Sequence, residues 1–153
     1  MNILVYATHQ HEDEQYMNEA GKVSIEAGLK MKDSNKDVVV TAITVGVNCE
    51  DALYEAYGMG VDQAALLVGE ETSANIACMI KKIPYDMIFI NDEIGAAVAE
   101  KLNVSSIEYK EETMKTAAKP CVVLMKENML TARYMNIANV FSAYDKKIVQ
   151  LSL

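Results

Sequence analysis

The 153-residue chain contains no tryptophan, two prolines and three cysteines. The cysteines, at positions 49, 78 and 121, are far apart and form no CxxC motif, which argues against a disulfide framework and a zinc site. The first residues form an apolar run typical of a strand and not a secretory leader. We therefore expect a protein of the reducing cytoplasm.

Basic residues are also scarce. The 14 Lys and Arg residues are outnumbered by 22 Asp and Glu residues, and they form no cluster that could follow a phosphate backbone. No apolar run approaches the roughly 20 residues that a membrane-spanning helix needs. Because 51% of the residues are apolar and 24% are charged, the composition is that of a globular protein. We expect one domain over residues 1–153 that binds neither nucleic acid nor membranes.

Short apolar runs alternate with helical patterns along the whole chain. In residues 51–68, apolar residues recur at helical spacing up to Tyr57, Gly58 and Gly60 permit the helix to end, and an apolar run of strand length follows. Such alternation is typical of βαβ units. The pattern predicts strands at 2–7, 38–45, 63–68, 86–91, 104–109 and 120–126, and helices at 17–33, 49–58, 72–83, 93–102 and 135–145.

These elements predict an α/β fold with a doubly wound, mainly parallel sheet. We expect the strand order 3-2-1-4-5, an additional strand from residues 120–126, and helices on both faces of the sheet. Helical spacing predicts that Val98 and Leu102, and likewise Ile137, Val140, Phe141 and Tyr144, face the core. Any ligand should bind at the carboxyl ends of the strands, near 7–14, 46–49, 69–72 and 91–95.

Several segments, in the right order, resemble the β subunit of electron transfer flavoproteins. Met17-Asn18 and the helix after it are similar to the family's Met-Asn-Pro and its first helix, and Ile43-Thr44-Val45-Gly46 is similar to the end of its second strand. The turn at 57–63 is similar to the family's Ala-Met-Gly-Ala-Asp-Arg, 119–124 to its Leu-Pro-Ala-Val-Val-Thr, and Arg133-Tyr134 to its Pro-Arg-Tyr signature.

The resemblance implies a non-catalytic scaffold in an electron-carrying pair. In that family an α subunit carries the redox FAD, and the β subunit holds an adenine nucleotide, either AMP or a second FAD. Gly46 and Gly95 would allow the ligand close to the backbone, and Asn18 would pair with an adenine or ribose edge. By resemblance, the cofactor-binding residues are Ala7, Asn18, Glu19, Ala20, Gly21, Gly46, Asn91, Asp92, Ile94 and Gly95.

The chain departs from the family at the turn before the fourth predicted helix. The family has a long loop there, rich in Gly and Thr, that surrounds the phosphate, whereas this chain has 89–95 with Asp92 and Glu93. A carboxylate would repel a phosphate at this position. The hairpin of the family is reduced to 110–119, and its C-terminal extension has no counterpart before Leu153. The alternative is a degenerate α/β binding or assembly module that has lost the nucleotide and homo-oligomerises.

Two other groups of residues have alternative interpretations. The run His9-Gln10-His11-Glu12-Asp13-Glu14 contains metal-ligand types, but it also fits a solvated acidic loop at the mouth of the cleft. Asn91, Asp92 and Glu93 could act as acid and base, or Asp92 could cap the helix while Glu93 favours its dipole. Because Walker, GxGxxG and nucleophile-elbow motifs are absent, hydrolase and kinase chemistry have no support.

Overall fold

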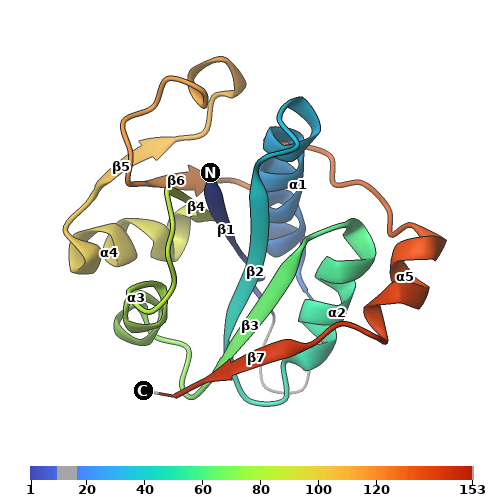
Figure 1. Ribbon diagram of the computed structural model, residues 1–153. Coiled ribbons are helices and arrows are strands. Elements are labelled where there is room, and N and C mark those ends of the chain that lie inside the picture. The colour runs from blue at the N-terminus through green and yellow to red at the C-terminus, as the bar shows by residue number, and fades with distance from the viewer. Residues whose placement is uncertain (10–16, 153) are drawn as a thin grey trace.

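The computed structural model describes residues 1–9 and 17–152, which form a parallel sheet of seven strands with five α-helices packed around it (Figure 1). Every strand pair in this sheet is parallel. The strands are β1 (Asn2–Tyr6), β2 (Val39–Gly46), β3 (Gln63–Val68), β4 (Met87–Asn91), β5 (Ser105–Glu108), β6 (Cys121–Met125) and β7 (Ile148–Leu151). The helices are α1 (Glu19–Ser34), α2 (Glu50–Met59), α3 (Ser73–Ile80), α4 (Asp92–Leu102) and α5 (Ile137–Ala143), with a 3-10 turn η1 (Glu111–Thr113). The predicted fold class is confirmed.

The strand order is β5-β6-β4-β1-β2-β3-β7, which differs in detail from the sequence-based expectation. The predicted additional strand, β6, lies between β4 and β5, and β7 was not predicted. The inner position of β6 and the edge position of β5 follow from their side chains. β6 is apolar and largely buried, whereas Ser105, Ser106 and Glu108 of β5 are exposed. An inner strand of a two-sided sheet must be apolar on both faces, so the polar strand takes the edge.

Alternate residues of each strand pack against opposite helical layers. From β1, Ile3 and Val5 belong to the core beneath α1 and α2, while Leu4 and Tyr6 belong to the core beneath α3 and α4. Figure 1 shows α1, α2 and α5 on one side of the sheet and α3 and α4 on the other. This arrangement is the doubly wound architecture, in which the order of the strands reverses between β1 and β4.

Two helix faces differ from the sequence-based expectation. On α4, Val98 is completely buried, as predicted, but Leu102 is only partly buried. The predicted core face of α5 is wrong for three of its four residues, because Ile137 is 75%, Phe141 69% and Tyr144, just after the helix, 81% exposed. Val140, the fourth, is half-buried against α2, where a Cβ at Gly58 would lie 3.3 Å from Val140 Cγ2.

Arg133 fixes the segment between β6 and α5 to α1. Its Nε and Nη2 donate to the two carboxylate oxygens of Glu26 at 2.8 and 2.9 Å, and Nη2 also donates to Asp33 Oδ2 at 2.8 Å. The backbone N–H of Arg133 donates to Glu26 Oε1 at 2.9 Å. Because the Glu26 side chain is 8% exposed, this paired charge holds the C-terminal part of the chain against the core.

Among the described residues, none of the helices combines the length and the apolar character needed to cross a lipid bilayer.

Candidate functional site

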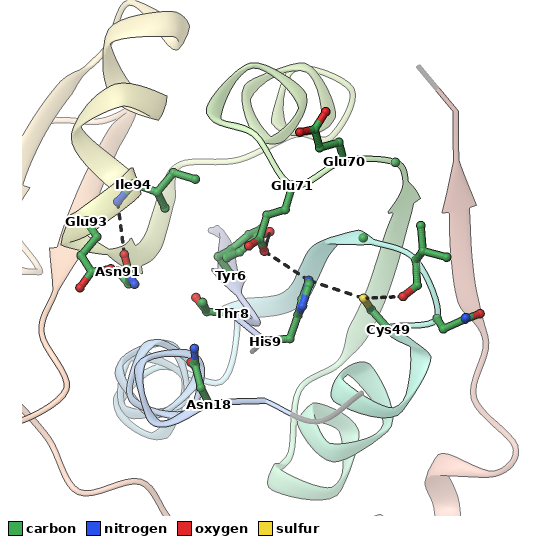
Figure 2. A pocket seen from close by; sticks show the side chains of 14 residues that line it. Tyr6, Thr8, His9, Asn18, Cys49, Glu70, Glu71, Asn91, Glu93 and Ile94 are labelled. Atoms are coloured by element: carbon green, nitrogen blue, oxygen red, sulfur yellow. Dashed lines mark hydrogen bonds and ion pairs between the residues drawn. The ribbon is translucent and has the colours of Figure 1, made fainter. Parts of the chain in front are cut away.

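A cleft of about 1300 Å³ lies at the carboxyl ends of β1 to β4 (Figure 2). It spans the boundary between β1 and β4, the position at which ligands bind in doubly wound sheets. All four segments that were expected at this edge contribute to its walls, and Tyr6 and Asn18 line it from outside those ranges. The lining residues are Tyr6, Thr8, His9, Asn18, Gly46, Val47, Asn48, Cys49, Gly69, Glu70, Glu71, Asn91, Glu93 and Ile94.

Two helices point their N-termini toward the cleft, and each is capped by an asparagine. Asn18 Oδ1 accepts from Gly21 N at 3.0 Å at the start of α1, and Asn91 Oδ1 accepts from Ile94 N at 3.3 Å at the start of α4. The expectation that Asp92 caps α4 is therefore wrong, because Asp92 is the first residue of that helix and Asn91 precedes it. The caps satisfy backbone N–H groups that would otherwise be free for a ligand.

Glu71 connects β1 to the far wall of the cleft. Its Oε2 accepts from the Tyr6 hydroxyl at 2.6 Å and lies 3.2 Å from His9 Nε2. The Tyr6 hydroxyl in turn accepts from Val45 N at 3.3 Å. Burial, and then the nearby Glu71 carboxylate, raise the pKa of Tyr6 well above its ordinary value. Tyr6 therefore remains a neutral donor that holds Glu71 in place.

His9 and Cys49 lie together but do not form a nucleophilic pair. His9 Nε2 is 2.9 Å from the Val45 carbonyl oxygen and 3.5 Å from Cys49 Sγ. Because a carbonyl oxygen only accepts, Nε2 carries the proton and cannot take one from the thiol. Burial, followed by Glu71 and Glu50, raises the pKa of Cys49, which also favours the unreactive thiol. Thiol catalysis therefore has no support at this position.

Thr8 contributes a polar atom without a partner. The residue is 9% exposed, and its Oγ1 makes no hydrogen bond within the described residues. Figure 2 shows Thr8 inside the cleft between Tyr6 and Asn18. A buried hydroxyl without a hydrogen bond is costly, so its position in a ligand-sized cleft suits a ligand that supplies the partner missing among the described residues.

The residues predicted from the resemblance fall into three groups. Asn18, Gly46, Asn91 and Ile94 line the cleft. Ala20 and Asp92 line a neighbouring cavity of about 510 Å³ that shares Asn91 and Glu93 with it. Ala7, Glu19, Gly21 and Gly95 line neither of the two cavities.

Gly95 has a different role from the one expected. A Cβ at this position would lie 2.5 Å from Leu124 Cδ2 and 3.0 Å from Ile90 Cγ2, so the glycine allows α4 to pack on the sheet and does not admit a ligand. At Gly46, by contrast, a Cβ would lie 2.5 Å from Cys49 Sγ and 2.9 Å from His9 Nε2, inside the cleft. Close packing, rather than ligand access alone, requires both glycines.

Sequence reasoning missed Tyr6, Thr8, Cys49 and Glu71 as cleft residues. Their segments were expected at the correct edge, but no local motif distinguishes these side chains. Tyr6 and Glu71 are separated by 65 positions, so only the fold brings them together.

The possible metal role of the loop after β1 receives no support from the residues with a described structure. Of its two histidines, His9 is described, whereas His11, Glu12, Asp13 and Glu14 lie outside the described residues. Within residues 1–9 and 17–152, no three His, Cys, Asp or Glu side chains are placed to hold a metal ion.

Comparison with known proteins agrees with this architecture. The electron transfer flavoprotein domain matches residues 3–153. The electron transfer flavoprotein subunit beta of Clostridium acetobutylicum is 28% identical over 167 residues, which cover 86% of this chain and 64% of that protein. The corresponding subunit of Thermoanaerobacterium thermosaccharolyticum is 27% identical, with coverages of 88% and 65%.

A third relative is the acryloyl-CoA reductase electron transfer subunit gamma of Anaerotignum propionicum, which is 26% identical, with coverages of 84% and 62%. The chain thus spans between 62% and 65% of the length of these relatives. Since the domain match covers nearly every residue, the chain belongs to the electron transfer flavoprotein family.

Proposed function

We propose that this chain is a β-type subunit of an electron transfer flavoprotein, a scaffold whose cleft holds the adenosine part of AMP or FAD. The redox FAD would belong to an α-type partner, and electron transfer would be the chemistry of that cofactor. The observation that carries the proposal is the unpartnered Thr8 Oγ1 in a cleft at the β1 and β4 boundary. This is where an α/β sheet presents its ligand.

The cleft fits the two halves of an adenine nucleotide unequally. Val47 and Ile94 offer apolar contact to a base, and the hydroxyl and amide groups of Thr8 and Asn18 offer hydrogen bonds to a base or ribose. A phosphate has no lysine or arginine in the lining to meet it. The residues therefore fit adenosine and do not fit a phosphate group.

An unpartnered apolar face supports the proposal of a partner chain. Tyr134 is 96% exposed and Met135 50%, next to the exposed Ile137, Phe141 and Tyr144 of α5. We define these five residues as the α5 face. Exposed apolar patches of this kind are typical of protein contact sites. In Figure 1, α5 lies at the outside of the layer that contains α1 and α2, where a second chain has access.

The proposed ligand is tested by the absorption spectrum of freshly purified protein together with mass analysis of the small molecules released by heat. We expect an adenosine-containing molecule and no flavin absorption beyond what a co-purified partner brings. If no adenine compound is released and none binds on titration, the proposal is wrong.

The alternative, a homo-oligomeric module without a ligand, is favoured by the same α5 face and by the acidic cleft. Light scattering coupled to size-exclusion chromatography distinguishes the two. A monomer that associates with an α-type subunit supports the proposal. A stable homo-oligomer that Phe141→Ser dissociates, combined with no adenine binding, supports the alternative.

A further inference from the structure

The ionisable groups of the cleft are almost all acidic. Glu70, Glu71 and Glu93 belong to the lining, and no lysine or arginine does. Among the described lining residues, His9 is the one basic side chain, and its Nε2 already lies 3.2 Å from Glu71 Oε2. Figure 2 shows the Glu71 carboxylate directed toward His9, with Glu93 on the opposite wall beside Asn91. Both walls of the cleft therefore carry a carboxylate, and that of Glu93 is exposed to solvent.

The helix N-termini offset this charge only in part. A phosphate usually binds at free N–H groups of a helix start, and the Asn18 and Asn91 side chains each already accept from one of these groups, Gly21 N in α1 and Ile94 N in α4. The start of α2, beyond Cys49, has no side-chain cap, but Glu50 and Asp51 occupy its first turn. These two carboxylates complement the dipole of that helix themselves.

What the cleft offers is hydrogen-bond acceptors and one unpartnered hydroxyl. Carboxylates at the carboxyl ends of strands bind ribose hydroxyls well, because the two oxygens accept from neighbouring O–H groups. Thr8 Oγ1, buried and without a hydrogen-bond partner among the described residues, can pair with a further hydroxyl or ring nitrogen. A ligand rich in hydroxyl and amine donors satisfies the carboxylates and Thr8 together, whereas a phosphate can accept from Thr8 Oγ1 but is repelled by the carboxylates.

We propose that the cleft selects a phosphate-free purine nucleoside of the adenosine type, with the wall containing Glu93 acting against a phosphate. The inference rests on the proposed placing of adenosine in this cleft. It differs from that proposal because it ranks ligands by charge. A single carboxylate several ångström from a phosphate, at an intermediate dielectric constant, corresponds to about a tenfold loss of affinity.

The test is isothermal titration of adenosine and of AMP into the parent protein, Glu93→Gln and Glu100→Gln. Glu93→Gln is preferred to a change at Glu71, because Glu71 also holds Tyr6 and His9. Glu100, exposed on the same helix and absent from the lining of the cleft, is the matched control. Circular dichroism checks that each variant is folded.

We expect the parent to bind adenosine about tenfold more tightly than AMP, and Glu93→Gln to narrow this ratio while Glu100→Gln leaves it unchanged. Raising the ionic strength should also narrow the ratio in the parent, because salt screens the repulsion. AMP binding as tight as adenosine, or a ratio that neither salt nor Glu93→Gln alters, overturns the inference and leaves the proposed function standing. If neither compound nor FAD binds to the parent, both are overturned.

Discussion

The Tyr6 hydroxyl donates to Glu71 Oε2 at 2.6 Å, and this bond links the end of β1 to the segment after β3 across the floor of the cleft. Tyr6 is completely buried, while the Glu71 side chain is 31% exposed. The buried tyrosine therefore holds in place the Glu71 carboxylate, which lines the cleft and is accessible to a ligand.

Tyr6→Phe should lower the free energy of unfolding by about 1 to 3 kcal/mol, because Val45 N–H loses the hydroxyl that accepts from it and Glu71 Oε2 keeps only its contact with His9 Nε2. Urea unfolding measures the loss. Tyr109→Phe is the control. Tyr109 is buried like Tyr6, with 9% of its surface exposed, but its hydroxyl makes no hydrogen bond within the described residues. Equal effects of the two substitutions would contradict the assigned network.

Cys49 should react with iodoacetamide only at a pH above that of an ordinary thiol, which titrates near about 8.5. Burial is the first cause of its raised pKa, and the Glu71 charge is the second. Glu71→Gln should therefore shift the pH profile of alkylation to lower pH, because removing a negative charge stabilises the thiolate. Peptide mapping by mass spectrometry isolates the Cys49 signal. An unchanged profile would show that Glu71 does not act on Cys49.

The raised pKa also has a consequence for stability. The thiol form is favoured in the folded state, so the contribution of Cys49 to stability is fully present below the pKa of the unfolded thiol and is lost as the pH rises through the folded value. Denaturant unfolding of parent and Cys49→Ser should thus show a difference that shrinks above about pH 8.5. A difference that grows with pH would contradict this sign.

The sequence predicted the layout of this protein better than its individual contacts. The passage from α2 to β3 and the segments at the carboxyl edge follow from periodicity and turn chemistry, which are local properties, and Gly46 follows from the family resemblance. The exposure of the α5 face does not follow from local properties, because Ile137, Phe141 and Tyr144 have the spacing of a buried stripe and yet are exposed. Spacing identifies an apolar face but does not say whether this chain or another one covers it.

A local sequence pattern could not predict the position of β6 either. β6 lies between β4 and β5 because the polar strand β5 tolerates the solvent-exposed edge of the sheet, and this is found only by comparing the two strands as a whole. Similarly, the family resemblance predicted that Gly95 admits a ligand. In the fold it packs against Leu124, whose strand lies almost 30 residues further along the chain, so the sequence around Gly95 could not show this contact.

Gly21→Ala should destabilise the protein more than Gly95→Ala. A Cβ at Gly21 would lie 2.6 Å from the Thr8 carbonyl oxygen and 2.8 Å from Thr8 N, so backbone would have to move. At Gly95 the close neighbour is the end of the Leu124 side chain, which can rotate away. The helix preference of alanine, about 1 kcal/mol, acts at both positions because both glycines lie in helices, so the overpacking cost of about 1 to 3 kcal/mol decides the order. Thermal and urea unfolding would contradict this order if Gly95→Ala lost more stability.

Arg133→Met should lower the free energy of unfolding by about 2 kcal/mol, since it leaves the Glu26 carboxylate in a largely buried position without its partner. This estimate is below the usual value for a buried pair because the Arg133 side chain is 35% exposed. Lys115→Met, at an exposed position, is the control. A loss no larger than that of the control would mean that the C-terminal segment is held by other contacts.

Nuclear magnetic resonance tests most directly whether the cleft at the β1 and β4 boundary holds adenosine. Adenosine is added to ¹⁵N-labelled protein, and the backbone amide shifts are followed. We predict saturable changes at Thr8, Gly46 and Asn91, which line the cleft, and none on the α5 face. Saturable changes confined to residues outside the cleft, or no changes at any concentration up to millimolar, would contradict the claim.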